Sequence, residues 1–319
     1  MKHRQLGRSG PQVSEIGLGC SGLGGAIDAR TADALVGAAL DVGITLFDTA
    51  DSYGQGRSET SLGAALTGRR HGALIATKFG TQMDHAGWLK GASGRYIVQA
   101  VEASLTRLRT DRIDLYQLHW PDPLTPIQET LEALERLVRA GKVLHTGCSN
   151  FSAAQIIEAD LTAHQLGLHG FVSLQAEYSL LARHAELDLL PAVAACGIGL
   201  LPYLPLAAGL LAKPDIDPQT APPGSRQARV EKLAARFAFQ DQAATPRLTA
   251  LRRFAAANGR PLLSLAFGWL LDHEIVASVI AGASTAAQVR ANAAAASRGS
   301  LTPDERVVLD RLTSDAAAA

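Results

Sequence analysis

The chain has 319 residues, of which 47% are hydrophobic and 19% charged, so its composition suits a folded protein with a sizeable core. Thirty basic residues balance thirty acidic ones and no basic run occurs, which argues against nucleic acid or an anionic membrane as a partner. Three cysteines without a CxxC pair, and an N-terminus without an apolar signal-peptide core, indicate a reducing, cytoplasmic setting.

The first expected element is a β-hairpin within residues 4–15, turning at Ser9 and Gly10, which would cover the bottom of a barrel. Apolar runs typical of strands then alternate with segments whose apolar residues recur every three or four positions. The predicted strands are Ile16–Cys20, Ile44–Phe47, Leu74–Thr77, Ile113–Leu118, Val143–Gly147, Phe171–Leu174, Ile198–Tyr203 and Val276–Ile280. Helical spacing is evident at Ala32–Leu40, Ile97–Leu108, Ile127–Val138 and Ser264–Leu271. Eight such alternations predict a parallel (β/α)8 TIM barrel, formed as one α/β domain over residues 1–319.

Two segments depart from this alternation. Leu189–Ala212 is uncharged over a length that suits a bilayer helix, but it contains three prolines and three glycines. It therefore predicts a helix end, a turn at Gly197, a buried strand and a glycine-containing loop. Lys213–Arg229 holds four prolines without an apolar period, which predicts a mobile lid.

One motif is misleading. Gly17, Gly19 and Gly22 match the G-x-G-x-x-G fingerprint of dinucleotide-binding Rossmann folds. In that fold the strand turns directly into a helix, whereas here the helical period begins only near Thr31. The glycines therefore predict a loop above the first strand.

Four polar residues, Asp48, Tyr53, Lys78 and His119, lie at or just after the ends of predicted strands. Each alone has an ordinary structural explanation, such as a turn cap or a core histidine. The carboxyl ends of barrel strands, however, carry the active site in this architecture. A buried Lys78 needs a partner, and Asp48 is the natural one. A phenol beside such an ammonium would donate a proton near neutral pH, which indicates carbonyl reduction, and no cluster indicates a metal site.

These motifs together resemble the aldo-keto reductase family over nearly the whole chain. The matching segments are FDTADSYGQGRSE, ATKFG, DLYQLHWPD, GCSNFS, LQAEYSLLAR, PYLPLAAGLL and VIAGASTAAQVRAN, in the family's order. The resemblance implies a barrel that binds an extended nicotinamide dinucleotide, NADP(H) or alternatively NAD(H), and reduces small aldehydes or ketones or oxidises alcohols.

The resemblance also implies residue roles. Tyr53 would protonate the carbonyl oxygen, Lys78 held by Asp48 would stabilise the phenolate, and His119 would orient the carbonyl. The implied cofactor-binding residues are Gly19, Cys20, Asp48, Ser149, Asn150, Gln175, Tyr203, Leu204, Leu206, Gly209, Leu210, Arg236, Gly282, Ser284, Gln288 and Asn292.

Two departures from the family pattern keep alternatives open. Leu204 stands where many members have serine, and the adenosine segment has Gly282 and Gln288 where many have cations for a 2′-phosphate. An NAD-dependent sugar or alcohol dehydrogenase of the same fold is therefore one alternative. A cofactor-binding regulatory subunit like the potassium-channel β-subunits is another, although the complete set of four polar residues favours an enzyme. No pattern indicates an oligomeric state.

Overall fold

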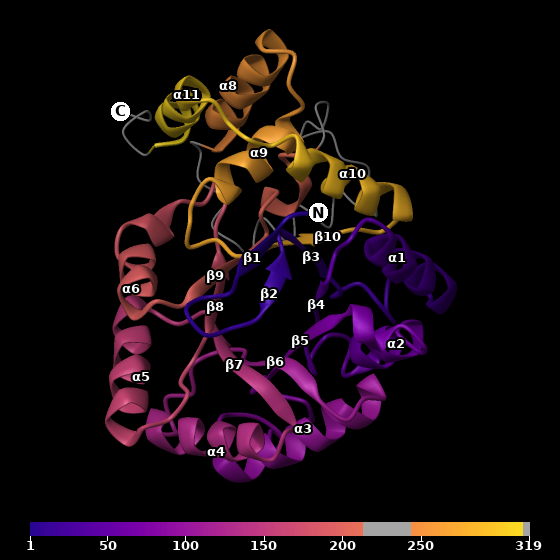
Figure 1. Ribbon diagram of the computed structural model, residues 1–319, viewed down its shortest axis with the longest axis vertical. Coiled ribbons are helices and arrows are strands. Elements are labelled where there is room, and N and C mark those ends of the chain that lie inside the picture. Colours follow the sequence, from indigo (N-terminus) through magenta and orange to yellow (C-terminus); the bar gives the residue numbers. More distant parts are fainter. Residues whose placement is uncertain (213–243, 315–319) are drawn as a thin grey trace.

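The computed structural model describes residues 1–212 and 244–314. Within them, eight parallel strands form a ring surrounded by helices (Figure 1). In spatial order these are β10 (Val279–Gly282), β3 (Ile16–Gly19), β4 (Leu46–Asp48), β5 (Leu74–Phe79), β6 (Ile113–Leu118), β7 (Val143–Ser149), β8 (Ser173–Glu177) and β9 (Gly199–Tyr203). The ring closes beside β10, because the Leu200 N–H donates to the Ile275 carbonyl at 2.7 Å and the Ala277 N–H donates to the Leu200 carbonyl at 3.0 Å. The predicted (β/α)8 barrel is confirmed.

The helices extend the predicted helical segments by up to three residues at either end. In chain order they are α1 (Ala29–Asp41), α2 (Arg57–Ala65), α3 (Gly94–Leu108), α4 (Ile127–Arg139), α5 (Ala153–Leu166), α6 (Leu189–Cys196), α8 (Ala244–Ala257), α9 (Leu262–Leu271), α10 (Ala286–Ser297) and α11 (Pro303–Thr313). Short 3-10 turns occur at η1 (Arg70–Gly72), η2 (His184–Glu186) and η3 (Ala207–Gly209). In α4, Pro126 occupies the N-cap and Gly141 follows the C-cap with a φ of 70°, a left-handed conformation that glycine adopts without strain.

The predicted N-terminal hairpin is present and covers the bottom of the barrel (Figure 1). Its strands are β1 (His3–Gln5) and β2 (Gln12–Ser14), paired antiparallel. Leu6 and Val13 are fully buried and pack with Leu46 and Leu115 inside the barrel. Gly7 touches the backbone at the start of β9, where a Cβ would come within 2.9 Å of the Gly199 nitrogen. The hairpin therefore acts as a plug that closes the end of the barrel at which the strands begin, opposite to their carboxyl ends.

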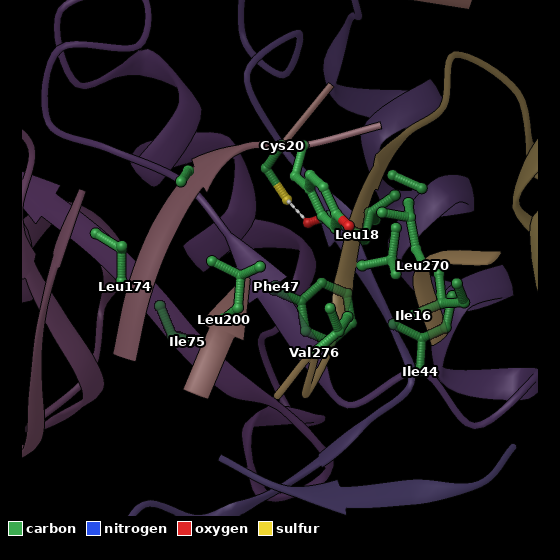
Figure 2. Close-up of a cluster of buried hydrophobic side chains, with 14 of the residues drawn as sticks. Ile16, Leu18, Cys20, Ile44, Phe47, Ile75, Leu174, Leu200, Leu270 and Val276 are labelled. Carbon is green, nitrogen blue, oxygen red and sulfur yellow. Dashed lines mark hydrogen bonds between the residues drawn. The ribbon is translucent and has the colours of Figure 1, made fainter. Parts of the chain in front are cut away.

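Side chains alternate between the two faces of each barrel strand. Figure 2 shows part of the outer layer, where Leu18, Phe47 and Leu174 belong to the cluster that also includes helix residues. Their strand neighbours, including Asp48 and Gln175, consequently point into the barrel. Polar inward positions near the carboxyl ends of the strands thus converge above the apolar plug.

Several predicted strand bounds are wrong. β4, β8 and β10 begin two or three residues later than predicted: the leading Ile44 and Phe171 pack against the core before strand pairing starts, and Val276 forms only an isolated bridge with Leu200. β4, β5, β7 and β8 also run further than predicted, through inward polar residues such as Asp48 and Lys78. The apolar runs mark burial, whereas strand pairing continues through these polar positions.

The uncharged segment Leu189–Ala212 folds as predicted into α6, a left-handed cap at Gly197, β9 and the turn η3. None of the helices in residues 1–212 and 244–314 combines the length and apolarity needed to cross a bilayer. The glycine motif is a loop, since β3 ends at Gly19 and α1 begins at Ala29. The predicted lid, Lys213–Arg229, lies outside the described residues.

Candidate active site

The four polar residues singled out in the sequence lie together at the carboxyl ends of β4, β5 and β6. Asp48 is the last residue of β4, Lys78 lies one residue before the end of β5, and His119 directly follows β6. Tyr53 is held in the turn between β4 and α2 by its backbone N–H, which donates to the Ala50 carbonyl at 3.2 Å. Adjacent strand ends bring these side chains together although 71 positions separate the first from the last.

The Lys78 ammonium occupies the centre of this group and is fully buried. Its Nζ donates to both Asp48 carboxylate oxygens at 2.7 and 2.8 Å, to the Thr49 carbonyl at 3.0 Å and to the Tyr53 hydroxyl at 3.4 Å. Burial alone would lower the pKa of Lys78, but Asp48 and Tyr53 hold that pKa above its ordinary value. The amine is therefore a permanent cation whose charge is directed at a phenol.

The Tyr53 hydroxyl is a protonated phenol in this arrangement. Burial raises the pKa of Tyr53, and the opposing effect of Lys78 does not cancel this rise. Lys78 lowers the pKa of Tyr53, as the sequence predicts for an ammonium beside a phenol, but burial outweighs this effect. A neutral phenol nevertheless keeps the proton that a general acid must donate, and Lys78 is placed to stabilise the phenolate left behind.

The His119 ring stands edge-on to Tyr53, with ring centroids 5.8 Å apart and planes at 82°. Burial, followed by the Lys78 charge, lowers the pKa of His119 to about 3, so the imidazole is neutral at physiological pH. Its Nδ1 lies 3.2 Å from the Thr81 hydroxyl and 3.5 Å from the Ser52 hydroxyl. If Nδ1 accepts from Thr81, Nε2 carries the hydrogen and becomes a donor.

A chain of hydrogen bonds connects the next three strands to this group. Gln175 Nε2 donates to Asp48 Oδ1 at 2.9 Å, and the Ser149 hydroxyl donates to the Gln175 carbonyl at 2.9 Å. Asn150 donates to the Ser149 hydroxyl at 3.1 Å and to the His119 carbonyl at 3.0 Å. The Tyr203 hydroxyl completes the chain by donating to Asn150 Oδ1 at 2.9 Å. The predicted carboxamide-binding residues thus form one connected surface beside the four polar residues.

The remaining predicted cofactor residues continue around the same end of the barrel. Gly19 pairs with Asp48 on one side and with Gly282 on the other, so β3 joins the two regions. Ser284 donates to Gln288 Oε1 from both its backbone N–H, at 2.8 Å, and its hydroxyl, at 3.2 Å. The other residues of this set lie after β9 or in α10: Leu204, Leu206, Gly209, Leu210 and Asn292. Arg236 lies outside the described residues.

Cys20 is buried in the outer apolar layer, and its Sγ donates to the Leu18 carbonyl at 3.4 Å (Figure 2). Burial, with a contribution from Asp48, raises the pKa of this thiol. Because the reactive form of cysteine is the thiolate, Cys20 is a packing residue here.

Sequence reasoning did not identify the carbonyl of Thr49 or the hydroxyls of Ser52 and Thr81. Hydroxyl residues in turns have no periodic signature, so only the folded arrangement places them beside Lys78 and His119. Asp51, two residues before Tyr53, was also missed. Its signal is a carboxylate in the ADSYG turn, three residues after Asp48, with no cation among its immediate neighbours in sequence.

Comparison with known proteins agrees with this fold and site. Residues 15–313 match the model of the aldo/keto reductase family, and the chain belongs to that family. Family membership implies an oxidoreductase that uses a nicotinamide cofactor at a carbonyl group.

Individual relatives fall into two groups by name. The chain is 35% identical to the aldo-keto reductase AKR11C1 from Bacillus halodurans in its holo form, with a TM-score of 0.79, covering 98% of this chain and 97% of that one. It is 35% identical to the uncharacterized oxidoreductase YqkF of Bacillus subtilis, covering 96% of this chain and 94% of the relative. It is also 35% identical to a probable voltage-gated potassium channel subunit beta of Oryza sativa, covering 92% of this chain and 90% of the relative.

Proposed function

We propose that this protein is a cytoplasmic, NADP(H)-dependent reductase that converts small aldehydes or ketones to alcohols, or catalyses the reverse, as a single barrel domain. The observation that carries the proposal is the Lys78 ammonium held by Asp48 at 2.7 Å and directed at the Tyr53 hydroxyl at 3.4 Å. Such a group is suited to delivering a proton and stabilising the resulting anion.

Tyr53 acts as the general acid in this proposal. Hydride addition to a carbonyl carbon leaves negative charge on oxygen, and that oxygen takes the Tyr53 proton. The phenolate that remains faces Lys78, whose charge is already in place, so no solvent has to reorganise during the step. Asp48 acts through Lys78, since it fixes the position of the ammonium with both carboxylate oxygens.

His119 orients the carbonyl oxygen in this proposal. The imidazole is neutral, so its ring N–H is a donor that leaves the charge of Lys78 undisturbed. The edge-on contact with Tyr53 supports this role, because it brings the two donor-bearing rings close together. A carbonyl oxygen between them would be held by two hydrogen bonds while the hydride arrives.

The residues present fit a nicotinamide dinucleotide, which when bound supplies the hydride. The half-buried Tyr203 ring offers an aromatic face beside the Asn150 amide, which suits a flat ring bearing a carboxamide. A Cβ added at Gly209 or Gly282 would meet no atom of residues 1–212 and 244–314 within 4 Å, so the described backbone there leaves room for a ligand. The α10 N-terminus, capped by Thr285, presents a site with partial positive charge.

A cofactor-binding regulatory subunit is the second candidate, because two of the similar proteins are named as probable potassium channel β-subunits. A steady-state assay with aldehydes, ketones and sugars, each with NADPH and NADH, separates the candidates. The reductase proposal predicts many moles of cofactor oxidised per mole of protein with at least one carbonyl. If no substrate leads to the oxidation of more than one mole of cofactor per mole of protein, the regulatory subunit is favoured.

A further inference from the structure

Asp51 is a buried carboxyl group that the proposed chemistry does not use. It is 1% exposed, and neither carboxyl oxygen makes a hydrogen bond of acceptable geometry with any residue in the described parts of the chain. Most buried polar groups are paired, so an unpaired carboxyl group two residues before the proposed acid requires an explanation.

The groups that interact electrostatically with the Asp51 carboxyl group belong to barrel strands and to the helices α2 and α3. The titratable and charged groups that act on it, or on which it acts, are Glu59 of α2, Arg107 and Tyr96 of α3, Lys78 of β5 and Tyr116 of β6. Arg107 Nε is already committed to Glu59 Oε2 at 2.6 Å, and Glu59 Oε1 accepts from the Thr77 hydroxyl at 2.6 Å. Lys78 is likewise committed to Asp48. Each nearby cation therefore has its own carboxylate, and Asp51 is the one without a counter-ion.

Asp51 is also part of the support of the proposed acid. Its backbone N–H donates to the Lys78 carbonyl at 3.0 Å, which ties the turn to the strand bearing the ammonium. The same turn carries Tyr53, whose carbonyl accepts from the Ser58 N–H at the start of α2 at 3.2 Å. A charge appearing on Asp51 would need water or a displaced neighbour, and the turn is the element nearest to give way.

We propose that Asp51 is a positioning residue of the active site, a carboxylic acid that must stay neutral for the Tyr53 turn to remain packed against the Lys78 strand, and whose ionisation loosens that turn. The kinetic part of this inference rests on the proposed reductase function. The structural part, neutrality of Asp51 and loosening of the turn, does not.

The electrostatics agree with this geometry. Burial and then the neighbouring Glu59 charge raise the pKa of Asp51 to about 8, while the Ser52 backbone, Arg107 and Lys78 oppose the rise without cancelling it. The folded state thus holds a proton that the unfolded chain releases near its ordinary pKa of 3.8. Stability is therefore lost as pH rises from the unfolded pKa to the folded one, and the loss is complete only above about 8.

The first test compares wild type with Asp51→Asn, a neutral isostere, by thermal unfolding across pH. The Tm of the variant minus that of wild type should increase as pH rises towards 9. The matched control is Asp114→Asn, because Asp114 is a buried carboxylate that does have a counter-ion, accepting from Arg70 at 2.6 Å. That variant should lose stability at neutral pH without this increase. If Asp51→Asn fails to fold, or shows the same pH dependence as wild type, the neutral acid is refuted.

The second test follows the turn itself by hydrogen exchange of the peptide spanning residues 48–58, corrected for intrinsic exchange rates. Wild type should lose protection there between about pH 7 and pH 9, and Asp51→Asn should keep it. Equal loss in both proteins would overturn the positioning role.

The kinetic readout follows if the protein reduces carbonyls. The alkaline decline of kcat should then move to higher pH in Asp51→Asn by at least about one unit, and an unmoved decline would contradict the proposal. An inactive wild type with the predicted exchange pattern would refute the reductase function and leave the structural part of the inference standing.

Discussion

Lys78 shows how one residue organises the site. An ammonium with no exposed surface costs several kcal/mol to desolvate, and the cost is met here by four acceptors on Asp48, Thr49 and Tyr53. Three of those acceptors come from the β4 strand end and the residue after it. The same contacts that make a buried cation tolerable also aim it at the phenol.

This dependence predicts the effect of Asp48→Asn on stability. Removing the carboxylate leaves a buried ammonium without a counter-ion, which should lower the free energy of unfolding by about 3 kcal/mol. Asp33→Asn is the control, because Asp33 pairs with Arg69 but its side chain is 64% exposed, and its loss should cost less than about 1 kcal/mol. Denaturant titration measures both, and equal effects would contradict the account of Lys78.

His119 yields a pH prediction. Its pKa is lowered from 6.5 to about 3, so the folded state binds fewer protons than the unfolded state in that window. Its contribution to stability is present above the unfolded pKa and is lost as pH falls towards the folded one. His119→Gln should therefore lose less stability than wild type between about pH 6.5 and pH 4.5. The free energy of unfolding, measured against pH for both proteins, tests this. If it falls equally in the two proteins, His119 is not held neutral.

The sequence was sufficient to predict Asp48, Tyr53, Lys78 and His119 as site residues, because the apolar runs show where the strands end. It was not sufficient for Asp51, Ser52 or Thr81. Their importance depends on which loop faces which ring after folding, and no local pattern encodes that.

The N-terminal hairpin is the clearest case of an element with a long-range role. Two short strands are marginal alone, and here they are stabilised by inserting Leu6 and Val13 into the barrel. The turn residues made this hairpin predictable. The starts of β4, β8 and β10 were not, because Ile44, Phe171 and Val276 are as apolar as strand residues although they lie before the continuous pairing begins.

Leu6→Ala tests the plug. Leu6 is fully buried among barrel-interior residues, so its truncation should leave a cavity and lower the free energy of unfolding by about 3 kcal/mol. Leu161→Ala is the control, since Leu161 on α5 is 55% exposed and should change stability by less than about 0.5 kcal/mol. A loss at Leu6 no greater than at Leu161 would mean that the hairpin does not support the barrel.

At the scale of the whole molecule, a single ring of strands brings three separated regions to one opening. The proposed acid lies after β4, the proposed carboxamide contacts lie at the end of β7 and within β8, and the proposed adenosine contacts begin at the end of β10. β3 links the first and last of these through the pairs of Gly19 with Asp48 and Gly282. An extended dinucleotide would fit along these strand ends. Binding of this kind does not require the Rossmann strand-to-helix turn, whose glycine motif is matched by Gly17, Gly19 and Gly22.

The choice of dinucleotide provides a test at this scale. A 2′-phosphate leaving water requires charge-assisted hydrogen bonds. The described adenosine region provides the Ser284 hydroxyl and the exposed Arg290, and further cations, Lys213, Arg226, Arg229 and Arg236, occur in the sequence outside the described residues. We therefore expect NADPH to bind more tightly than NADH, but only by about tenfold.

Exposed charge pairs are screened within about 8 Å at physiological ionic strength, so this preference should shrink as salt rises. Dissociation constants for both cofactors at low and high salt measure it. NADH binding as tightly as NADPH at low salt would reject the NADP assignment and favour the NAD-dependent dehydrogenase.

The most direct test of the central claim, that Tyr53 delivers the proton in a carbonyl reduction, compares wild type with Tyr53→Phe. Phenylalanine keeps the ring beside His119 and removes only the hydroxyl that faces Lys78. With a carbonyl that wild type turns over, the variant should bind NADPH with a similar dissociation constant and reduce kcat by at least about 100-fold. A kcat close to that of wild type, with cofactor binding intact, would contradict the account.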